Sequence, residues 1–278
     1  NSTISTNLGG GVLFMNSTGL IEDSIISNNQ GFDVYDYFYG AGVTVNCSQV
    51  TINRTTINEN TTSAFPGGAG VIQSGSCGSD LFISNSTISG NESDSWGGGI
   101  LSDAPGAYLI LSQVTVSQNV CNIDGNGLGC GMNSFNTTAY VYQSLFSGNQ
   151  NHSNNTYTNE INTDSVVAID PFSLIGLNSN SGSYGLTPGY SIPTVANLSE
   201  IIDTNLSDNG GLTPTHALVW NGPAVDLVPE GSCFTLNDQT NKARPIDALG
   251  DGDASCDVGS YEAISDIIFK NGLEPPIP

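Results

Sequence analysis

Basic residues are scarce in this sequence of 278 residues. Four lysines and arginines stand against 26 acidic residues, which gives a formal net charge of −22 at pH 7. A chain of this sign repels phosphate backbones and anionic lipids, and binding to either requires a basic patch. Nucleic acid is therefore excluded as an expected partner. An acidic, solubilising surface explains the charge.

Charged residues of either sign are also few, and long hydrophobic runs are absent. Charged residues make up 11% of the chain, which is too few for the Lys- and Glu-rich surfaces of exposed helices. No stretch has the length and apolarity of a transmembrane helix or the pattern of a signal peptide, so we expect no membrane insertion by this segment. Ser, Thr, Asn and 34 glycines dominate instead. This composition favours strands and turns, and it predicts an all-β protein.

The cysteines form an even set of six, which permits three disulfides. Two of them are close enough to close a loop, and two share the C-terminal segment. The remaining two occupy similar places in successive repeats, where stacked backbones lie within about 5 Å of each other. We predict Cys121–Cys130 as the short loop, Cys233–Cys256 as the pair in the C-terminal segment, and Cys47–Cys77 as the pair in successive repeats. Three disulfides indicate an oxidising compartment, and free buried thiols are the alternative.

One short phrase, typified by SNSTISGN, returns through the first 150 residues. It contains an apolar residue, a small polar residue and, three positions after the apolar one, an asparagine. A cluster of glycines followed by an apolar residue returns beside it. Both features step by 22 to 32 residues, which is the range of solenoid repeats.

Short alternating runs such as QVTVS lie within each repeat and indicate strands. A repeat of about 30 residues has room for three short strands and their turns, but not for a crossover helix. We therefore predict a right-handed parallel β-helix, a solenoid with three strands per coil. Regular coils are expected over residues 1–150, and irregular coils with a disulfide-bonded C-terminal cap over 151–262. Residues 263–278 fit either a sorting or processing signal or a frayed end.

The columns of the repeat predict which side chains stack. The apolar residues of the phrase are expected to point inward, and their small polar neighbours outward. The asparagine is placed at a sharp corner, in the left-handed conformation that Gly and Asn adopt most easily. Its side-chain amide is expected to bond to the amides of the coils above and below, as in cross-β stacks. The predicted ladder contains Asn7, Asn29, Asn60, Asn91, Asn119 and Asn149.

After residue 150 the period fades and other motifs follow in a fixed order: DNGGLTPTHAL, GPAVD, DQ with RP, and CDVGSYE. As a set they resemble the C-terminal part of the choice-of-anchor Q family, from about Asp170 to Glu262. The resemblance implies a bacterial β-helix protein that is exported and attached to a surface. It implies no catalytic residues, because the family has no generally assigned reaction. WNGPAVDLV departs from the family's usual Ser-Pro-Ala-Ile-Asp-Ala-Gly pattern, and no long hydrophobic anchor follows Glu262.

The C-terminal segment is expected to cap the solenoid, because an open stack exposes unpaired strand edges. Its aromatic residues and its disulfide fit a compact cap. Arg244 is expected to pair with Asp238, Asp257 or Glu262. Asp226 is expected to act at a turn rather than in catalysis.

Catalysis is not predicted, although many β-helices cleave acidic polysaccharides. Lyases of that kind use Lys or Arg, and Arg54 is the one basic residue in the regular coils. Hydrolases need two carboxylates about 5 to 9.5 Å apart, and the coils show no such pair. His152 lies in a polar insertion, and His216 is expected to be structural, without an obvious serine or cysteine partner. A polysaccharide lyase or hydrolase is the alternative function.

The loop GDGDASCD is the best metal candidate. Its alternating carboxylates Asp251, Asp253 and Asp257 suit calcium, although the loop is shorter than an EF-hand and lacks the distal Glu. A solvated loop is the alternative interpretation. No cofactor besides calcium is expected.

These observations favour a secreted or cell-surface protein, an adhesin or structural rod without catalysis. Its expected partners are carbohydrate, another cell-surface ligand, or copies of itself joined end to end. A flat face that binds ice or carbohydrate is a second alternative, because outward hydroxyls would recur about every 4.8 Å along the stack. The threonines of that face are Thr3, Thr56, Thr87 and Thr115.

Overall fold

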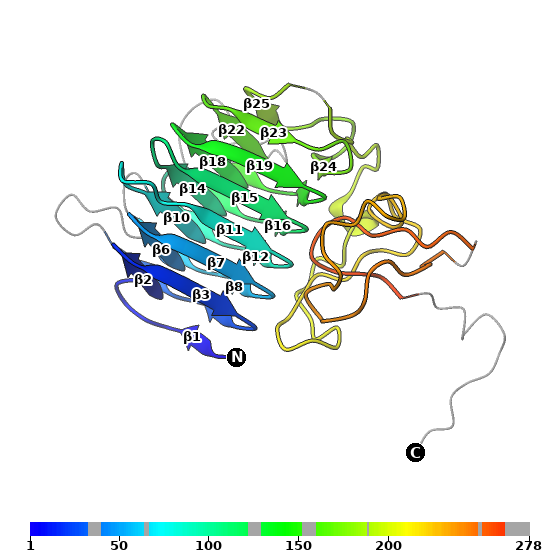
Figure 1. Ribbon diagram of the computed structural model, residues 1–278, viewed down its shortest axis with the longest axis horizontal. Helices are drawn as coiled ribbons and strands as arrows, with labels where there is room; N and C mark the ends of the chain where they lie inside the picture. Colours follow the sequence, from blue (N-terminus) through cyan, green and yellow to red (C-terminus); the bar gives the residue numbers. More distant parts are fainter. Residues whose placement is uncertain are drawn as a thin grey trace, which may run out of the picture.

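The chain winds into coils whose strands pair in parallel with the strands of the next coil (Figure 1). The computed structural model describes residues 1–32, 40–63, 67–121, 129–151, 160–187, 189–249 and 252–264. Each full coil supplies one strand to each of four sheets, here named A to D. Sheet B contains five strands, so five coils contribute to all four sheets.

The strands of each sheet are neighbours in the order given. Sheet A contains β1 (Thr3–Ser5), β4 (Ile25–Ser27), β8 (Thr56–Asn58), β12 (Thr87–Ser89), β16 (Thr115–Ser117), β20 (Leu145–Ser147) and β24 (Leu174–Ile175). Sheet B contains β5 (Gln30–Gly31), β9 (Thr61–Thr62), β13 (Glu92–Ser93), β17 (Val120–Cys121) and β21 (Gln150–Asn151).

Sheet C contains β2 (Val12–Met15), β6 (Val43–Asn46), β10 (Val71–Ser74), β14 (Ile100–Asp103), β18 (Met132–Phe135), β22 (Ile161–Thr163) and β25 (Ser183–Tyr184). Sheet D contains β3 (Thr18–Glu22), β7 (Gln49–Asn53), β11 (Leu81–Ser84), β15 (Tyr108–Ser112), β19 (Thr138–Tyr142) and β23 (Val167–Ile169). One short 3₁₀ helix, η1 (Leu198–Glu200), follows in the C-terminal segment.

Sheet B is an addition to the three strands per coil that the sequence predicts. Its strands contain two residues each and begin directly after the repeated asparagine. A strand of two residues shows no alternation of apolar and polar side chains. Periodicity therefore could not reveal it.

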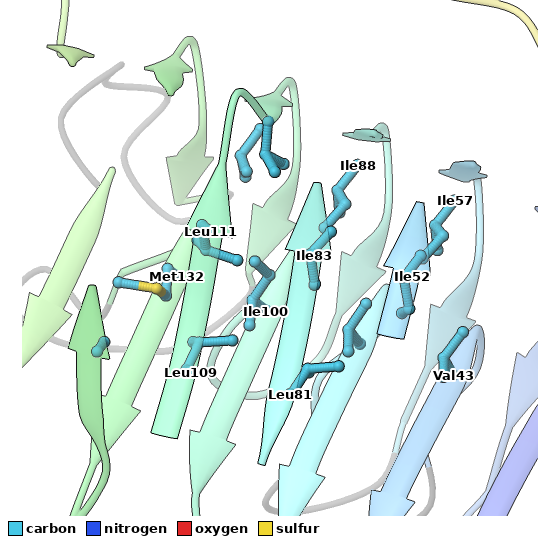
Figure 2. Packing of buried hydrophobic residues seen from close by; sticks show 14 of the residues in the cluster. Val43, Ile52, Ile57, Leu81, Ile83, Ile88, Ile100, Leu109, Leu111 and Met132 are labelled. Carbon is cyan, nitrogen blue, oxygen red and sulfur yellow. The ribbon is translucent and has the colours of Figure 1, made fainter. Parts of the chain in front are cut away.

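The predicted apolar column is present in sheet A. Ile57, Ile88 and Val116 are aligned partners in successive coils. Each has an exposed fraction of 0%. Figure 2 shows Ile57 and Ile88 beside Ile52 and Ile83 of sheet D, so sheets A and D pack against a shared interior. The remaining members of the column are Ile4, Ile26 and Phe146.

The asparagine ladder is also present. The amide Nδ2 of Asn60 donates to Oδ1 of Asn91 at 2.9 Å, and that of Asn91 donates to Oδ1 of Asn119 at 2.9 Å. Each amide also reaches a carbonyl of the preceding coil, as Asn91 Nδ2 does with the oxygen of Ile57 at 3.0 Å. These bonds satisfy polar groups that are fully buried, and they fix the height of one coil on the next. The same contacts join Asn7 to Asn29, Asn29 to Asn60, and Asn119 to Asn149.

The left-handed residue at this corner is the one before the asparagine, which corrects the prediction. Glu59 has a φ of 54° and Gln118 a φ of 57°. The chain must reverse its curvature there so that the next residue can turn its amide into the stack. Gly90 and Gly148 take the same place in two further coils, with φ of 64° and 79°, and Thr6 and Asn28 take it before Asn7 and Asn29.

A carboxyl group ends the ladder. Oε2 of Glu160 accepts the amide Nδ2 of Asn149 at 2.5 Å, and its Oε1 accepts the backbone N–H of Gly148 at 2.9 Å. Complete burial raises the pKa of Glu160 to about 8, because the charged form loses its hydration. The backbone of Glu160 follows Gly131 in the stack, and its carboxyl takes the place of the side-chain amide that a further asparagine would supply.

The raised pKa of Glu160 predicts a pH dependence of stability. The folded state holds a proton that the unfolded state releases near pH 4.5, so the free energy of unfolding falls as pH rises from about 5 to about 8. Glu160→Gln removes this slope. We expect the stability of the variant relative to the parent to rise over that window, by at most about 4 to 5 kcal/mol, and to level off above it.

Urea denaturation of both proteins at several pH values measures this difference. Other buried carboxyl groups, such as Asp257 and Glu262, are present in both proteins, so their contributions cancel in the stability difference. A constant difference between the two proteins across the window would contradict the assignment.

A glycine precedes the sheet C strand of each of the five full coils because the next coil lies too close for a side chain. A Cβ on Gly70 would overlap the carbonyl oxygen of Gly99 and crowd the amide of Asn91. Gly42 meets Gly70 in the same way. The glycine clusters of the sequence thus serve tight packing between coils.

We predict that Gly70→Ala destabilises the protein by about 1 to 3 kcal/mol or more, because neither the carbonyl nor the ladder can move aside. Gly189→Ala is the matched control, since a Cβ there meets nothing within 4 Å and its φ is ordinary. Thermal unfolding of the two variants compares them directly. Equal melting temperatures would refute the packing argument.

All three predicted disulfides are formed. Their Cα–Cα distances are 5.2 Å for Cys47–Cys77, 5.0 Å for Cys121–Cys130 and 6.0 Å for Cys233–Cys256. The first links successive coils, as the repeat alignment requires. The third lies within the C-terminal segment.

The C-terminal segment covers the side of the stack rather than its end. We call residues 192–249 and 252–264 the cover; in Figure 1 they lie, coloured yellow to orange, beside the strands of sheet A. Gln239 of the cover accepts the hydroxyl of Thr87 at 2.7 Å and donates to the hydroxyl of Thr56 at 2.9 Å. Ser260 bonds to the hydroxyl of Thr115 at 3.1 Å. The cover therefore docks on hydroxyl groups from three successive coils.

This docking overturns the predicted flat face. The exposed fractions are 0% for Thr56 and Thr87 and 2% for Thr115, so these hydroxyls bind the cover and not ice or carbohydrate. The serine column beside them, expected to face solvent, is buried as well, with Ser89 and Ser117 at 3% and 0%. Both columns do point away from the core. The sequence pattern shows that these side chains point away from the core, but it does not show whether they meet solvent or another segment of the chain.

A buried ion pair holds the cover together. Arg244 and Glu262 approach to 2.8 Å with fully buried side chains, and Arg244 also donates to the carbonyl of Asp257 at 2.7 Å. Asp257 and Asp238, the other two predicted partners, accept backbone N–H groups, from Ala263 and Lys242 among others. Three residues of the family-like motifs, Arg244, Asp257 and Glu262, thus lie in the interior of the cover.

Candidate functional site

A cleft of about 960 Å³ separates the cover from the solenoid. The solenoid wall consists of residues next to the asparagine ladder in sheets A and B. The opposite wall comes from the cover, from the segment around η1 and from Pro214 and His216. The solenoid residues are Asn58, Glu59, Ser89, Gly90, Gln118, Gly148 and Gln150, and the remaining cover residues are Ala196, Asn197, Leu198, Ser199, Thr204, Asn205 and Leu206.

The left-handed corner shapes the solenoid wall. Glu59, Gly90, Gln118 and Gly148 occupy this corner in four successive coils. Long polar side chains and glycines alternate there, so the wall is uneven along the stack. Leu198 of the cover packs over Gly148, where a Cβ would collide with it. The shape of the cleft thus depends on which residue each coil carries at this corner.

His216 joins the two walls. Its Nε2 lies 2.8 Å from the hydroxyl of Ser89, and its Nδ1 lies 2.8 Å from the carbonyl oxygen of Asp203. A carbonyl only accepts, so Nδ1 carries the proton and Nε2 accepts from Ser89. Burial lowers the pKa of His216, which favours this neutral ring. Sequence spacing could not reveal this serine partner, because Ser89 lies 127 residues away.

A serine beside a histidine resembles a nucleophile and its base. Here Ser89 is 3% exposed and His216 is 2% exposed. The N–H of Gly90, which follows Ser89, already donates to the carbonyl of Ser117, so it offers no oxyanion donor. The pair links the cover to the solenoid.

The charged groups of the cleft are few. Among the described lining residues, Glu59 supplies the one carboxylate, and no Lys or Arg is present. The two-carboxylate arrangement of a glycoside hydrolase is thus incomplete in this lining. The remaining polar atoms are amides and hydroxyls, which can donate to and accept from a neutral, hydroxylated ligand.

The described basic residues are engaged elsewhere. Arg54 pairs with Asp23 at 2.7 Å and with Glu22 at 3.0 Å. Lys242 lies 4.3 Å from the ring centroid of Tyr261, and Arg244 is buried in the cover. These three basic side chains therefore do not line the cleft, where a lyase would need them. Lys270 and His152 lie outside the described residues.

The predicted calcium ligands are only partly described. Asp251 lies outside the described residues. Asp257 is buried, and its carboxylate accepts the backbone N–H groups of Asp226 at 2.7 Å and Ala263 at 2.5 Å. Within the described part of the chain, no group of three His, Cys, Asp or Glu side chains could hold a metal ion. The calcium site stays a prediction, with Asp257 committed to backbone contacts.

Comparison with known proteins agrees with the architecture. Residues 1–119 match the family model of a right-handed β-helix region. The chain forms a right-handed parallel β-helix. No curated protein and no solved structure gives a significant match. None of the described helices has the length and apolarity needed to span a membrane.

The contact between Ser89 and His216 predicts a measurable coupling. Each of Ser89→Ala and His216→Ala should lower the free energy of unfolding by about 1 to 3 kcal/mol, because each leaves a buried polar partner unsatisfied. The double variant should lose less than the sum of the two, by at least about 0.5 kcal/mol.

Urea denaturation of the four proteins in this cycle measures the coupling. Additive losses would show that the two side chains act independently. The same cycle with Asn197→Ala in place of Ser89→Ala serves as the control, because Asn197 lines the cleft, bonds to the side chain of Glu200 and shares no partner with His216.

Proposed function

We propose that this protein is a non-catalytic, extracellular or cell-surface β-helix that binds carbohydrate in the cleft between solenoid and cover. The cleft lining carries the proposal. Its polar side chains are amides, hydroxyls, one carboxylate and the imidazole of His216, on a scaffold held by the ladder and the backbone pairing between coils. Such groups match the hydroxyls of a sugar. They provide neither the basic cluster of a lyase nor the paired carboxylates of a hydrolase.

The extracellular location is supported by the three disulfides, which form and persist in oxidising compartments. The resemblance to choice-of-anchor Q proteins supports attachment at a bacterial surface. A stiff stack that presents a binding cleft would suit an adhesin or a structural rod. The net charge of −22 favours neutral over acidic glycans, since like charges repel.

Two substitutions in the cleft test the proposal. Glu59 and Gln118 project from the left-handed corner of the solenoid wall, where other coils carry glycine, so their side chains can be changed without altering the core. We expect Gln118→Ala and Glu59→Gln to weaken binding of soluble neutral oligosaccharides about tenfold each, the loss of one good hydrogen bond. A glycan array followed by calorimetry measures this.

Gln49→Ala is the matched control, because Gln49 is exposed on sheet D, away from the cleft lining. Absence of glycan binding by the parent protein would overturn the proposal. Release of reducing ends or unsaturated products from a polysaccharide, abolished by Glu59→Gln, would instead establish an enzyme.

A further inference from the structure

Aromatic side chains gather on the outer face of sheet D, a surface that the cleft does not include. Strand pairing aligns the outward residues Phe82, Ile110 and Tyr140 in three successive coils. Tyr108 and Tyr142 lie on the same face, two residues from Ile110 and Tyr140. The alternation that buries their neighbours in the core keeps these side chains outside.

The rings form a continuous run. The centroids of Tyr108 and Tyr140 are 6.3 Å apart, and those of Tyr140 and Tyr142 are 6.2 Å apart, with the latter two planes within 6° of parallel. Phe234 of the cover continues the run by stacking on Tyr142 at 4.4 Å. We call Phe82, Tyr108, Tyr140, Tyr142 and Phe234 the aromatic row.

The aromatic row is exposed at three of its five members, and Tyr140 and Tyr142 are half-buried. Phe82 is 41% exposed, Tyr108 47% and Phe234 54%. A monomeric protein seldom leaves several large rings exposed side by side without a binding purpose. The position of Phe234 is itself fixed, by the adjacent Cys233–Cys256 disulfide and by its backbone N–H, which donates to Oε1 of Gln143 at 2.9 Å. Solenoid and cover thus build one surface together.

The chemistry of the row selects its ligand. Tyrosine combines an apolar ring with a hydroxyl, so it can lie against the C–H face of a sugar and bond to the sugar's hydroxyls. Thr51, Ser84 and Ser112 lie beside the rings on the same face and add hydroxyl groups. Charge decides between the remaining partners. A second copy of this chain, or an acidic polysaccharide, would meet a protein of net charge −22, whereas a neutral glycan would not be repelled.

We infer that the aromatic row on sheet D binds a neutral polysaccharide chain, as a second site separate from the cleft. The inference rests on the proposed carbohydrate-binding function and extends it from short soluble glycans to the surface of a polymer. A run of rings across several coils contacts successive sugar units at once. Binding to a polymer should therefore exceed binding to a single sugar.

The test is sedimentation of the full chain with insoluble cellulose and insoluble chitin, and with cross-linked pectate as the acidic probe. We expect binding to at least one neutral polymer and none to pectate. Tyr140→Ala combined with Tyr142→Ala should reduce retention at least tenfold. Tyr184→Ala is the matched control, because Tyr184 is 60% exposed on sheet C and lies outside the row.

A gain-of-binding variant keeps the inference testable if removal of two rings impairs folding. Thr51 is an exposed residue aligned with Phe82 in the neighbouring coil, so Thr51→Tyr extends the row by one ring and should increase retention severalfold. Unchanged retention in both Thr51→Tyr and the double variant would overturn the inference. Parent protein that sediments with no neutral polymer, or that binds pectate instead, would overturn it too.

Measuring soluble oligosaccharide binding and polymer sedimentation for both the cleft variants and the tyrosine variants distinguishes the two sites. Gln118→Ala should weaken binding of soluble oligosaccharides and leave sedimentation unchanged, and the tyrosine variants should do the reverse. If soluble binding persists and polymer binding is absent, the aromatic row is not a site but the proposed function stands. If both are absent, both proposals fail.

Discussion

Register between successive coils is the constraint on which the rest of the structure depends. Backbone pairing alone would tolerate a shifted stack, but the asparagine ladder would not, because a shift leaves buried amides without partners. Each amide is shared between two coils, as Asn91 is between Asn60 and Asn119. The glycines before sheet C strands then let the coils approach, and the isoleucine column fills the space so defined. The repeated spacing of these residues therefore sets the stacking of the core column, the position of the turn and the distance between coils.

The cover uses the same regularity in a different way. The outward hydroxyls of sheet A would suit a solvent face, yet they bond to Gln239 and Ser260 of the cover. Hydroxyls and side-chain amides both donate and accept, so the two surfaces satisfy each other's polar groups. Leu145 and Leu174 of sheet A also pack into the apolar cluster that fills the cover. The ion pair of Arg244 and Glu262 makes the cover a body with its own interior. Docking leaves a polar cleft on one side and carries Phe234 to the aromatic row on another.

The two surfaces differ in what they can recognise. The cleft is walled and polar, and its shape comes from long side chains and glycines alternating at one corner. The aromatic row is open, and its rings come from outward positions of sheet D and from the cover. Both depend on the strict vertical alignment of the coils. The proposed glycan-binding role at a cell surface would unite them with the disulfides and the acidic charge.

The sequence by itself determined the solenoid. Repeated Ile and Asn at fixed spacing specify which residues stack, so the core column, the ladder and Cys47–Cys77 could be predicted. The left-handed corner was placed one residue late, because both Asn and its predecessor favour turns and the repeat does not say which one carries the positive φ.

Only the tertiary structure decided where the cover lies, and with it the site. Ser89 and His216 are 127 residues apart, and Thr87 and Gln239 are 152 apart. The cover has no repeat, so no period relates its residues to a face of the solenoid. Periodicity shows which side chains point outward, but whether they meet solvent depends on contacts between segments distant in the chain.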